Sequence, residues 1–129
     1  MENTANKIRS FTDLNAWNEG HKLVLRVYKI TKTFPKEELF RLVSQLCRAA
    51  VSITSNIAEG FSRNYAKEKL QFYFISLGSI TETQNQILIA RDLGYITKEE
   101  FKKIADQTII VAKLIRGLMK AVSSKIQNT

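Results

Sequence analysis

The chain contains few of the residues that interrupt helices or cross-link distant segments. One proline and five glycines occur in 129 residues, which favours long uninterrupted helices. Cys47 is the single cysteine, so a disulfide within the chain is excluded and a reducing compartment, the cytoplasm, is favoured. No apolar run approaches the roughly 18 residues of a membrane-spanning helix, and the first residues do not resemble a secretory leader. We therefore expect a cytoplasmic protein that does not cross a membrane.

The residues that catalytic and metal sites need are equally scarce. His21 is the single histidine and has no glutamate three positions before it, so the metal-binding pattern of ferritin-like bundles is absent. Zinc-ligand spacing, haem-attachment motifs and glycine-rich phosphate loops are also absent. His21 and Cys47 could meet across two helices, but no third group is present to orient them. We therefore expect no metal, no cofactor and no enzymatic activity.

Acidic residues are outnumbered by basic ones. The chain has 20 Lys and Arg against 12 Asp and Glu, for a net charge of +8 and a sequence pI near 9.7. Such a charge favours nucleic acid or another polyanion as a partner, because cationic side chains neutralise phosphates and release counterions. The alternative is that the charge serves only solubility.

Apolar periodicity predicts four helices, at about residues 13–33, 37–59, 65–93 and 98–124. Residues 1–10 lack this periodicity and are predicted to form a flexible tail, so the domain is expected to span residues 11–129. The connections are short, and the last helix has a heptad-like apolar stripe that favours left-handed packing. The predicted fold class is all-α, an up-down-up-down four-helix bundle with left-handed packing.

Local signals define the ends of these helices. Thr12 is expected to cap the first helix, and Pro35 is expected to end it because the residue before proline avoids the α region. Gly60 and Gly94 are expected to follow the second and third helices as left-handed C-terminal residues. Residues 97–100 (TKEE) have the spacing of a capping box and predict the start of the last helix.

Two helices carry more apolar surface than one side can bury. The first has two stripes on nearly opposite faces, and in so short a chain a second subunit is the simplest cover for the second stripe. The last helix has two apolar residues outside its main stripe. The predicted oligomer-interface residues are Leu23, Val27, Ile30, Phe34, Ile110 and Leu114.

The second helix has an unusual polar face, composed of small hydroxyl and carboxamide side chains with two arginines and one glutamate. This composition favours a close helix contact or a specific site over bulk water. The last helix carries Lys113, Arg116 and Lys120 on one ridge, which could bind phosphates or could merely interact with the helix dipole. The candidate nucleic-acid-binding residues are Arg41, Arg48, Arg63, Lys67, Lys113, Arg116 and Lys120.

A series of residues across the chain resembles a known family. The segment Arg48-Ala-Ala-Val-Ser52, followed by Asn56-Ile-Ala-Glu-Gly60, is the most specific part. The other shared residues are Phe11, Asp13, Leu14, Trp17, Val27, Tyr28, Phe34, Pro35, Glu38, Gln45, Leu46, Ile53, Ser55, Arg63, Phe72, Gly78, Ser79, Glu82, Leu93, Gly94 and Tyr95. Over about residues 11–120 the chain is similar to the bacterial 23S rRNA intervening-sequence proteins. The accessory variability proteins of diversity-generating retroelements belong to the same family.

The resemblance implies a small cytoplasmic bundle that assembles as a ring-like homopentamer with a basic channel. It also implies an association of the retroelement members with nucleic acid and a reverse transcriptase. By position, the family-like residues are Arg48, Ser52, Asn56, Glu59, Gly60 and Arg63. Whether they bind RNA or hold the fold together stays open. Thr54 is a departure, since the family usually has proline there.

Two hypotheses follow for the function. The first is a non-enzymatic, oligomeric bundle that binds RNA or DNA mainly through phosphates, with little base readout. The second is a protein-interaction scaffold or accessory subunit, for example to a reverse transcriptase, without a direct nucleic-acid role.

Overall fold

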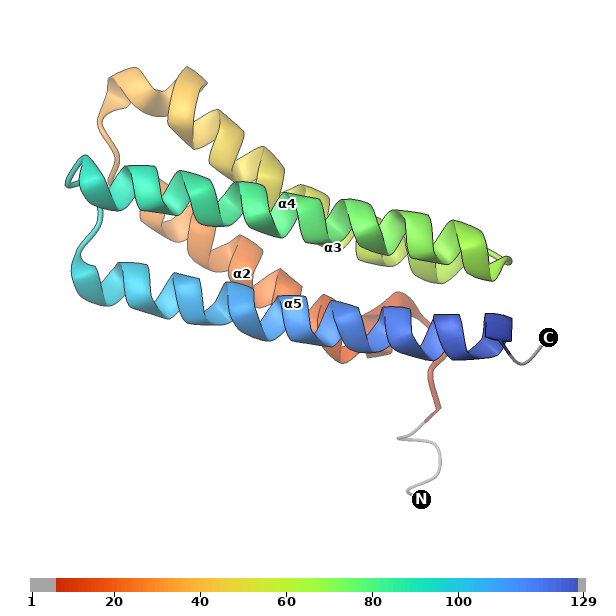
Figure 1. The fold of residues 1–129 in the computed structure, drawn as a ribbon. Coiled ribbons are helices and arrows are strands. Elements are labelled where there is room, and N and C mark those ends of the chain that lie inside the picture. The colour runs from red at the N-terminus through yellow and green to blue at the C-terminus, as the bar shows by residue number, and fades with distance from the viewer. Residues whose placement is uncertain (1–6, 128–129) are drawn as a thin grey trace.

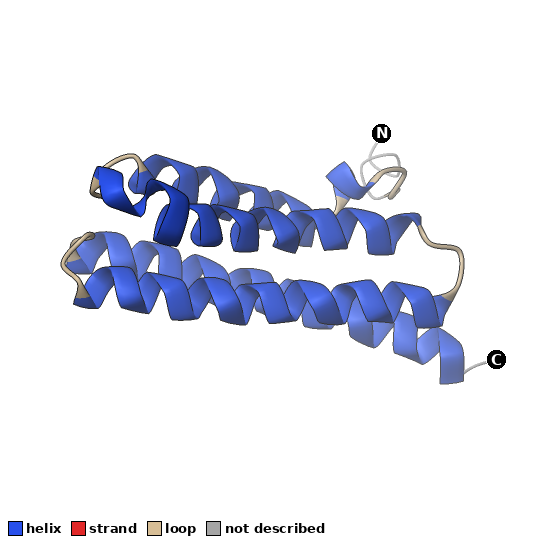
Figure 2. Ribbon diagram, turned by 90° about the horizontal axis from the view of Figure 1, so that it is seen from above, coloured by secondary structure: helices blue, strands red, loops and turns tan. Residues whose placement is uncertain are grey.

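Four long helices lie side by side in the computed structural model, which describes residues 7–127 (Figure 1). They are α2 (Asn15–Thr31), α3 (Ser44–Ser62), α4 (Ala66–Asp92) and α5 (Lys98–Gln127). Successive helices run in opposite directions, each packs on the next, and α5 closes the bundle against α2 (Figure 1). Only helices and loops occur in the described part of the chain (Figure 2). The predicted all-α, up-down-up-down four-helix bundle is therefore confirmed.

The start of the bundle is capped by Ser10 rather than by Thr12. A short 3-10 helix, η1 (Phe11–Asp13), precedes α2, and the Ser10 hydroxyl accepts a hydrogen bond from the Thr12 backbone N–H at 3.3 Å. The Asp13 carboxylate accepts backbone N–H bonds from Arg9 at 2.9 Å and Ser10 at 3.1 Å. The hydrogen bond from Arg9 is the main cause that lowers the pKa of Asp13, and the bond from Ser10 lowers it further. Of the predicted tail, residues 1–10, Ser10 takes part in this cap, and residues 1–6 lie outside the described residues.

The segment predicted as one helix over 37–59 begins with two irregular turns. A 3-10 turn, η2 (Lys36–Glu38), and a π turn, η3 (Leu39–Val43), precede α3. The Tyr95 hydroxyl donates a 2.8 Å hydrogen bond to the Glu38 carboxylate, which raises the pKa of Tyr95. The Tyr95 ring also packs on Phe34, with 5.3 Å between ring centroids. This contact ties the corner between α2 and α3 to the loop between α4 and α5.

The predicted boundary between α4 and α5 is confirmed by its hydrogen bonds. Gly94 has a φ of 80°, which suits glycine in the left-handed region. The Tyr95 N–H donates to the Ala90 carbonyl at 2.9 Å and the Gly94 N–H donates to the Arg91 carbonyl at 3.0 Å, the pattern of a Schellman motif. The Glu100 N–H then donates to the Thr97 hydroxyl at 3.0 Å, and the Thr97 N–H donates to the Glu100 carboxylate at 2.9 Å.

The prediction that Gly60 follows the second helix is wrong. Helix α3 continues to Ser62, and Gly60 is buried within its last turns. The exposed backbone at the end of α3 is satisfied by Lys69, whose Nζ donates to the carbonyls of Gly60 at 3.3 Å and Phe61 at 2.7 Å. Burial, and then the nearby charge of Lys125, lower the pKa of Lys69. The Lys69 ammonium group therefore binds the C-terminal end of α3.

The structure contradicts the prediction for three of the interface residues, because they lie in the core. Leu23 and Val27 are fully buried and Phe34 is buried, all within the bundle of this same chain. They have no surface to offer a second subunit, so that assignment is wrong. The side of α2 that faces solvent instead carries Leu25, which is 57% exposed. A helical wheel shows that α2 has two apolar stripes, but only its neighbours α3 and α5 decide which residues of each stripe are covered.

The other predicted interface residues differ in their exposure. Ile30 and Leu114 are partly buried and pack against the core, whereas Ile110 is 43% exposed on α5. An intersubunit role for Ile110 stays a prediction.

Candidate functional site

Several of the family-like residues lie in the contact between α3 and α4. The hydroxyls of Ser52 and Ser79 are 2.8 Å apart across this contact. The Asn56 amide donates to the Ser52 carbonyl at 2.8 Å and to the Ser52 hydroxyl at 3.0 Å. The fully buried Ser76 hydroxyl donates to the Ile53 carbonyl at 2.8 Å. Small hydroxyl side chains let the two helices approach closely while their polar atoms stay paired. Ser52 and Asn56 therefore contribute to helix packing.

Gly60 allows the closest approach in this contact. A Cβ atom at position 60 would lie 2.6 Å from Cε1 and 2.9 Å from Cδ1 of the buried Tyr73 ring. Gly78, by contrast, has no atom within 4 Å of its would-be Cβ. The small residues that bring α4 close to α3 are thus Ser76 and Ser79, and Gly78 lies on the outer side of the helix.

Arg63 and Glu59 form a pair at the end of α3. The Arg63 guanidinium is 3.3 Å from the Glu59 carboxylate, and its central carbon lies 4.6 Å from the centroid of the Phe72 ring. Both side chains stay largely exposed, so the ion pair itself contributes little to stability. The pairing partly neutralises a cation that was predicted to contact phosphate.

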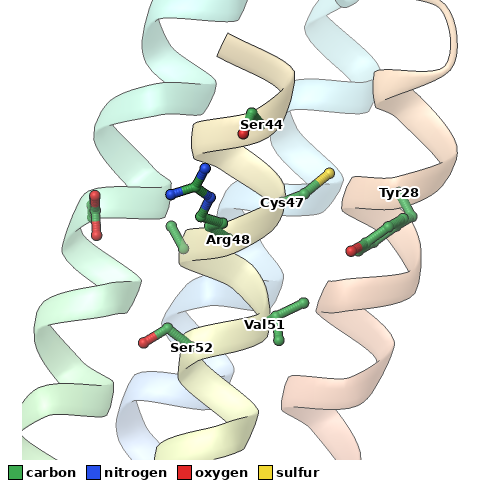
Figure 3. A pocket seen from close by; sticks show the side chains of 8 residues that line it. Tyr28, Ser44, Cys47, Arg48, Val51 and Ser52 are labelled. Carbon is green, nitrogen blue, oxygen red and sulfur yellow. The ribbon is translucent and has the colours of Figure 1, made fainter. Parts of the chain in front are cut away.

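Arg48 lines a shallow pocket on the outer face of α3 (Figure 3). Arg48 and Ser52 point from α3 toward α4, while Tyr28 points from α2 toward α3 (Figure 3). Among the described side chains, no carboxylate lies within 4.0 Å of Arg48, although Glu82 lines the same pocket. The pocket has a volume of about 650 Å³ and is lined by Tyr28, Ser44, Cys47, Arg48, Ala49, Val51, Ser52 and Glu82. Cys47 is partly buried, with its sulfur 3.8 Å from the Thr31 hydroxyl.

The remaining predicted phosphate contacts are exposed cations. They form no salt bridge among the described side chains, in contrast to Arg63. Three of them follow one outward ridge of α5, called the α5 ridge below. The exposed set is Arg41, Lys67, Lys113, Arg116 and Lys120, the last three being the α5 ridge.

Within residues 7–127, no three His, Cys, Asp or Glu residues gather where a metal ion could be held. Over the same residues, no helix combines the length and the apolar character that crossing a membrane requires.

The shared sequence motifs therefore coincide with the contacts that define the bundle. Phe34, Glu38 and Tyr95 join one end, and Ser52 and Gly60 fit α3 onto α4. A family model described as 23S rRNA-intervening sequence protein matches residues 12–117, a span that includes all of these positions. The chain belongs to this family. Its motif is recognisable because it specifies how the helices meet.

A solved structure has the same fold as this chain. It is the crystal structure of a protein of unknown function from the S23 ribosomal protein family of Bacteroides thetaiotaomicron. The two chains are 22% identical and superpose with a TM-score of 0.75, over 81% of this chain and 95% of the other. At this identity the likeness shows the fold alone. No curated protein matches the chain.

Two surfaces of this family member were not predicted from its sequence. One is a groove between α2 and α5 that gathers Arg26, Lys29 and Lys103. These cations come from two helices, so the sequence contains only a weak signal for them, the i, i+3 spacing of Arg26 and Lys29 on α2.

The second missed surface is the outer face of α4, on which large apolar side chains remain exposed. The sequence does contain a signal for it, because residues 70–90 include one charged residue, Glu82. A helix that is apolar on all sides is normally covered on all sides. The α4 outer face is defined by Phe74, Ile75, Leu88, Ile89 and Leu93.

Proposed function

We propose that this member of the 23S rRNA-intervening sequence family is a non-enzymatic cytoplasmic protein that binds nucleic acid through its phosphates. The α5 ridge carries the proposal. Lys113, Arg116 and Lys120 are exposed, have no salt-bridge partner among the described side chains, and belong to a helix without an acidic residue after Asp106. A favourable interaction with the helix dipole alone would not require three cations on one ridge.

The dimensions of the ridge suit a phosphate backbone. Lys113 and Lys120 are seven residues apart, or about 10 Å along the helix axis at 1.5 Å per residue. Successive phosphates of one duplex strand advance by about 3.4 Å, so the ridge spans roughly three of them. Contacts of this kind carry little sequence information. The family description names rRNA, which makes structured RNA the first ligand to test.

We further propose that the protein acts as a homo-oligomer, and the family resemblance implies a ring of five. The α4 outer face supports this proposal, because Phe74 is 62% exposed and Leu93 is 55% exposed beside other apolar residues. Phe74 lies next to Ile75 toward one end of this face, and Leu93 lies near Leu88 and Ile89 at the other end. Exposed groups of large apolar side chains commonly mark a protein interface. Assembly would also bring several copies of the α5 ridge to one nucleic acid, which increases the overall affinity.

The test is the salt dependence of RNA binding. Fluorescence anisotropy with a structured RNA between 50 and 200 mM KCl should give a linear log–log plot with a negative slope of about 0.7 to 0.9 per phosphate contact. Replacing Lys113, Arg116 and Lys120 with glutamine should make the slope shallower by about 2 to 3 and weaken binding about tenfold at 100 mM KCl.

The matched control replaces Lys22, Lys32 and Lys102 with glutamine, which removes the same charge from positions outside the ridge. Lys22 and Lys102 already pair with Glu19 and Asp106. A wild-type slope near zero would contradict the proposed function. Equal losses in the ridge and control variants would mean that only the total charge matters and would remove the ridge from the proposal.

A second candidate function is an interaction scaffold or accessory subunit, for example to a reverse transcriptase. The exposed apolar residues of α4 favour it, since they could bind another protein as readily as a second copy. In that case wild-type protein should bind no RNA at low salt while its assembly is unaffected by the ridge substitutions.

A further inference from the structure

The groove between α2 and α5 gathers three cations around an apolar floor. It has a volume of about 480 Å³. Arg26 and Lys29 line one wall from α2, and Lys103 lines the other from α5. The remaining lining residues are Ile30, Thr33, Glu100 and Ile104.

These three cations differ from their neighbours on the same helices. Lys22 on α2 is 2.9 Å from Glu19, and Lys102 on α5 is 2.8 Å from Asp106. No carboxylate among the described side chains lies within 4.0 Å of Arg26, Lys29 or Lys103. The bundle thus pairs the flanking lysines and leaves the cations of the groove without an acidic partner.

The one carboxylate in the groove is already engaged. Glu100 accepts hydrogen bonds from the Thr97 N–H at 2.9 Å and the Thr97 hydroxyl at 3.1 Å, as part of the cap of α5. It therefore serves the helix end, and three cations face one carboxylate in the groove as a whole. An anionic ligand would relieve the repulsion among them.

The shape of the groove suits a phosphate group. Ile104 is only 1% exposed and Ile30 is partly buried, so the cations surround a floor with a lower local dielectric than open surface. An arginine on one wall can bind two phosphate oxygens at once, and lysines on both walls can each contact a further oxygen as point charges.

We propose that the α2–α5 groove binds the phosphate groups of a nucleic-acid strand, as a second contact site besides the α5 ridge. This inference rests on the proposed function and specifies where the nucleic-acid strand lies on the protein. Lys103 and Lys113 are ten residues (103 to 113) apart on α5, about 15 Å along its axis and about 80° around it. A strand that contacts both sites must therefore cross α5 obliquely, from the groove toward the ridge.

The groove variant replaces Arg26, Lys29 and Lys103 with glutamine in the full chain, and the matched control replaces Lys22, Lys32 and Lys102. Each variant removes three positive charges from α2, its C-terminal end and α5. With a structured RNA at 100 mM KCl, the groove variant should lose about tenfold in affinity and its log–log salt slope should become shallower by about 2 to 3. The control should stay within about twofold of wild type. Circular dichroism melts should show that both variants keep the fold of the wild type.

A second measurement tests directly whether phosphate binds in the groove. Titration of wild-type protein with inorganic pyrophosphate should shift the NMR signals of Ile30, Thr33 and Ile104, and the groove variant should show no such shifts. If RNA binds the wild type while the groove variant retains its affinity and slope, the groove assignment is overturned and the proposed function stands. If the wild type binds no RNA, both the groove assignment and the proposed function are contradicted.

Discussion

Replacing Gly60 with alanine is expected to lower the free energy of unfolding by about 2 kcal/mol. The added Cβ would lie 2.6 and 2.9 Å from two atoms of the Tyr73 ring and 3.1 Å from Cβ of Phe72. Overpacking a core costs about 1 to 3 kcal/mol, and the upper end applies because the buried ring cannot rotate away from the contact. Alanine returns roughly 1 kcal/mol through its better helix propensity. Urea unfolding at one fixed protomer concentration measures the difference, since assembly would otherwise contribute.

Gly78 is the matched control for this substitution. It lies in the same pair of packed helices, but a Cβ there meets nothing within 4 Å. The Gly78→Ala variant should therefore gain about 0.5 to 1 kcal/mol, because within the protomer only the helix propensity changes. If the two alanine variants changed stability in the same direction, the close approach of α3 and α4 at Gly60 would be contradicted.

Replacing Phe74 and Ile89 together with aspartate is expected to weaken self-association by at least about 100-fold. Both side chains lie on the α4 outer face, with exposed fractions of 62% and 41%. In an assembly that buries this face, two desolvated carboxylates would lack partners, and each unpaired buried charge costs several kcal/mol. Light scattering after size-exclusion chromatography should show an oligomer for the wild type and a monomer for the variant.

The comparison variant replaces Leu25 and Ile109 with aspartate. These residues are also exposed and apolar, at 57% and 49%, but lie on α2 and α5. This variant should keep the wild-type mass. A monomeric comparison variant together with an oligomeric Phe74/Ile89 variant would move the interface to the surface of α2 and α5, and a monomeric wild type would contradict assembly altogether.

Local chemistry explains which helix ends could be predicted. Gly94 and the capping pair Thr97 and Glu100 act within a few residues of their own positions, and the structure confirms both. Gly60 has the same residue type as Gly94, yet it lies inside a helix because its partner, Tyr73, comes from the next helix. A glycine that ends a helix and a glycine that admits a neighbour cannot be distinguished without that neighbour.

The candidate site divides in the same way. The α5 ridge lies on one helix, so the spacing of Lys113, Arg116 and Lys120 is enough to place them on one face. The groove joins Arg26 to Lys103, which are far apart in the chain and meet only because α5 closes the bundle against α2.

The sequence by itself determined the family, the four helices and the cationic ridge, because each depends on residue type and on spacing within one segment. Only the tertiary structure decided that Leu23 is covered while Leu25 is exposed, and that Arg26 and Lys103 share a groove. The physical reason is that burial and charge pairing depend on the facing helix. Residues of similar apolar character, such as Val24 and Leu25, have similar local preferences, and packing against α3 and α5 decides which of them is covered.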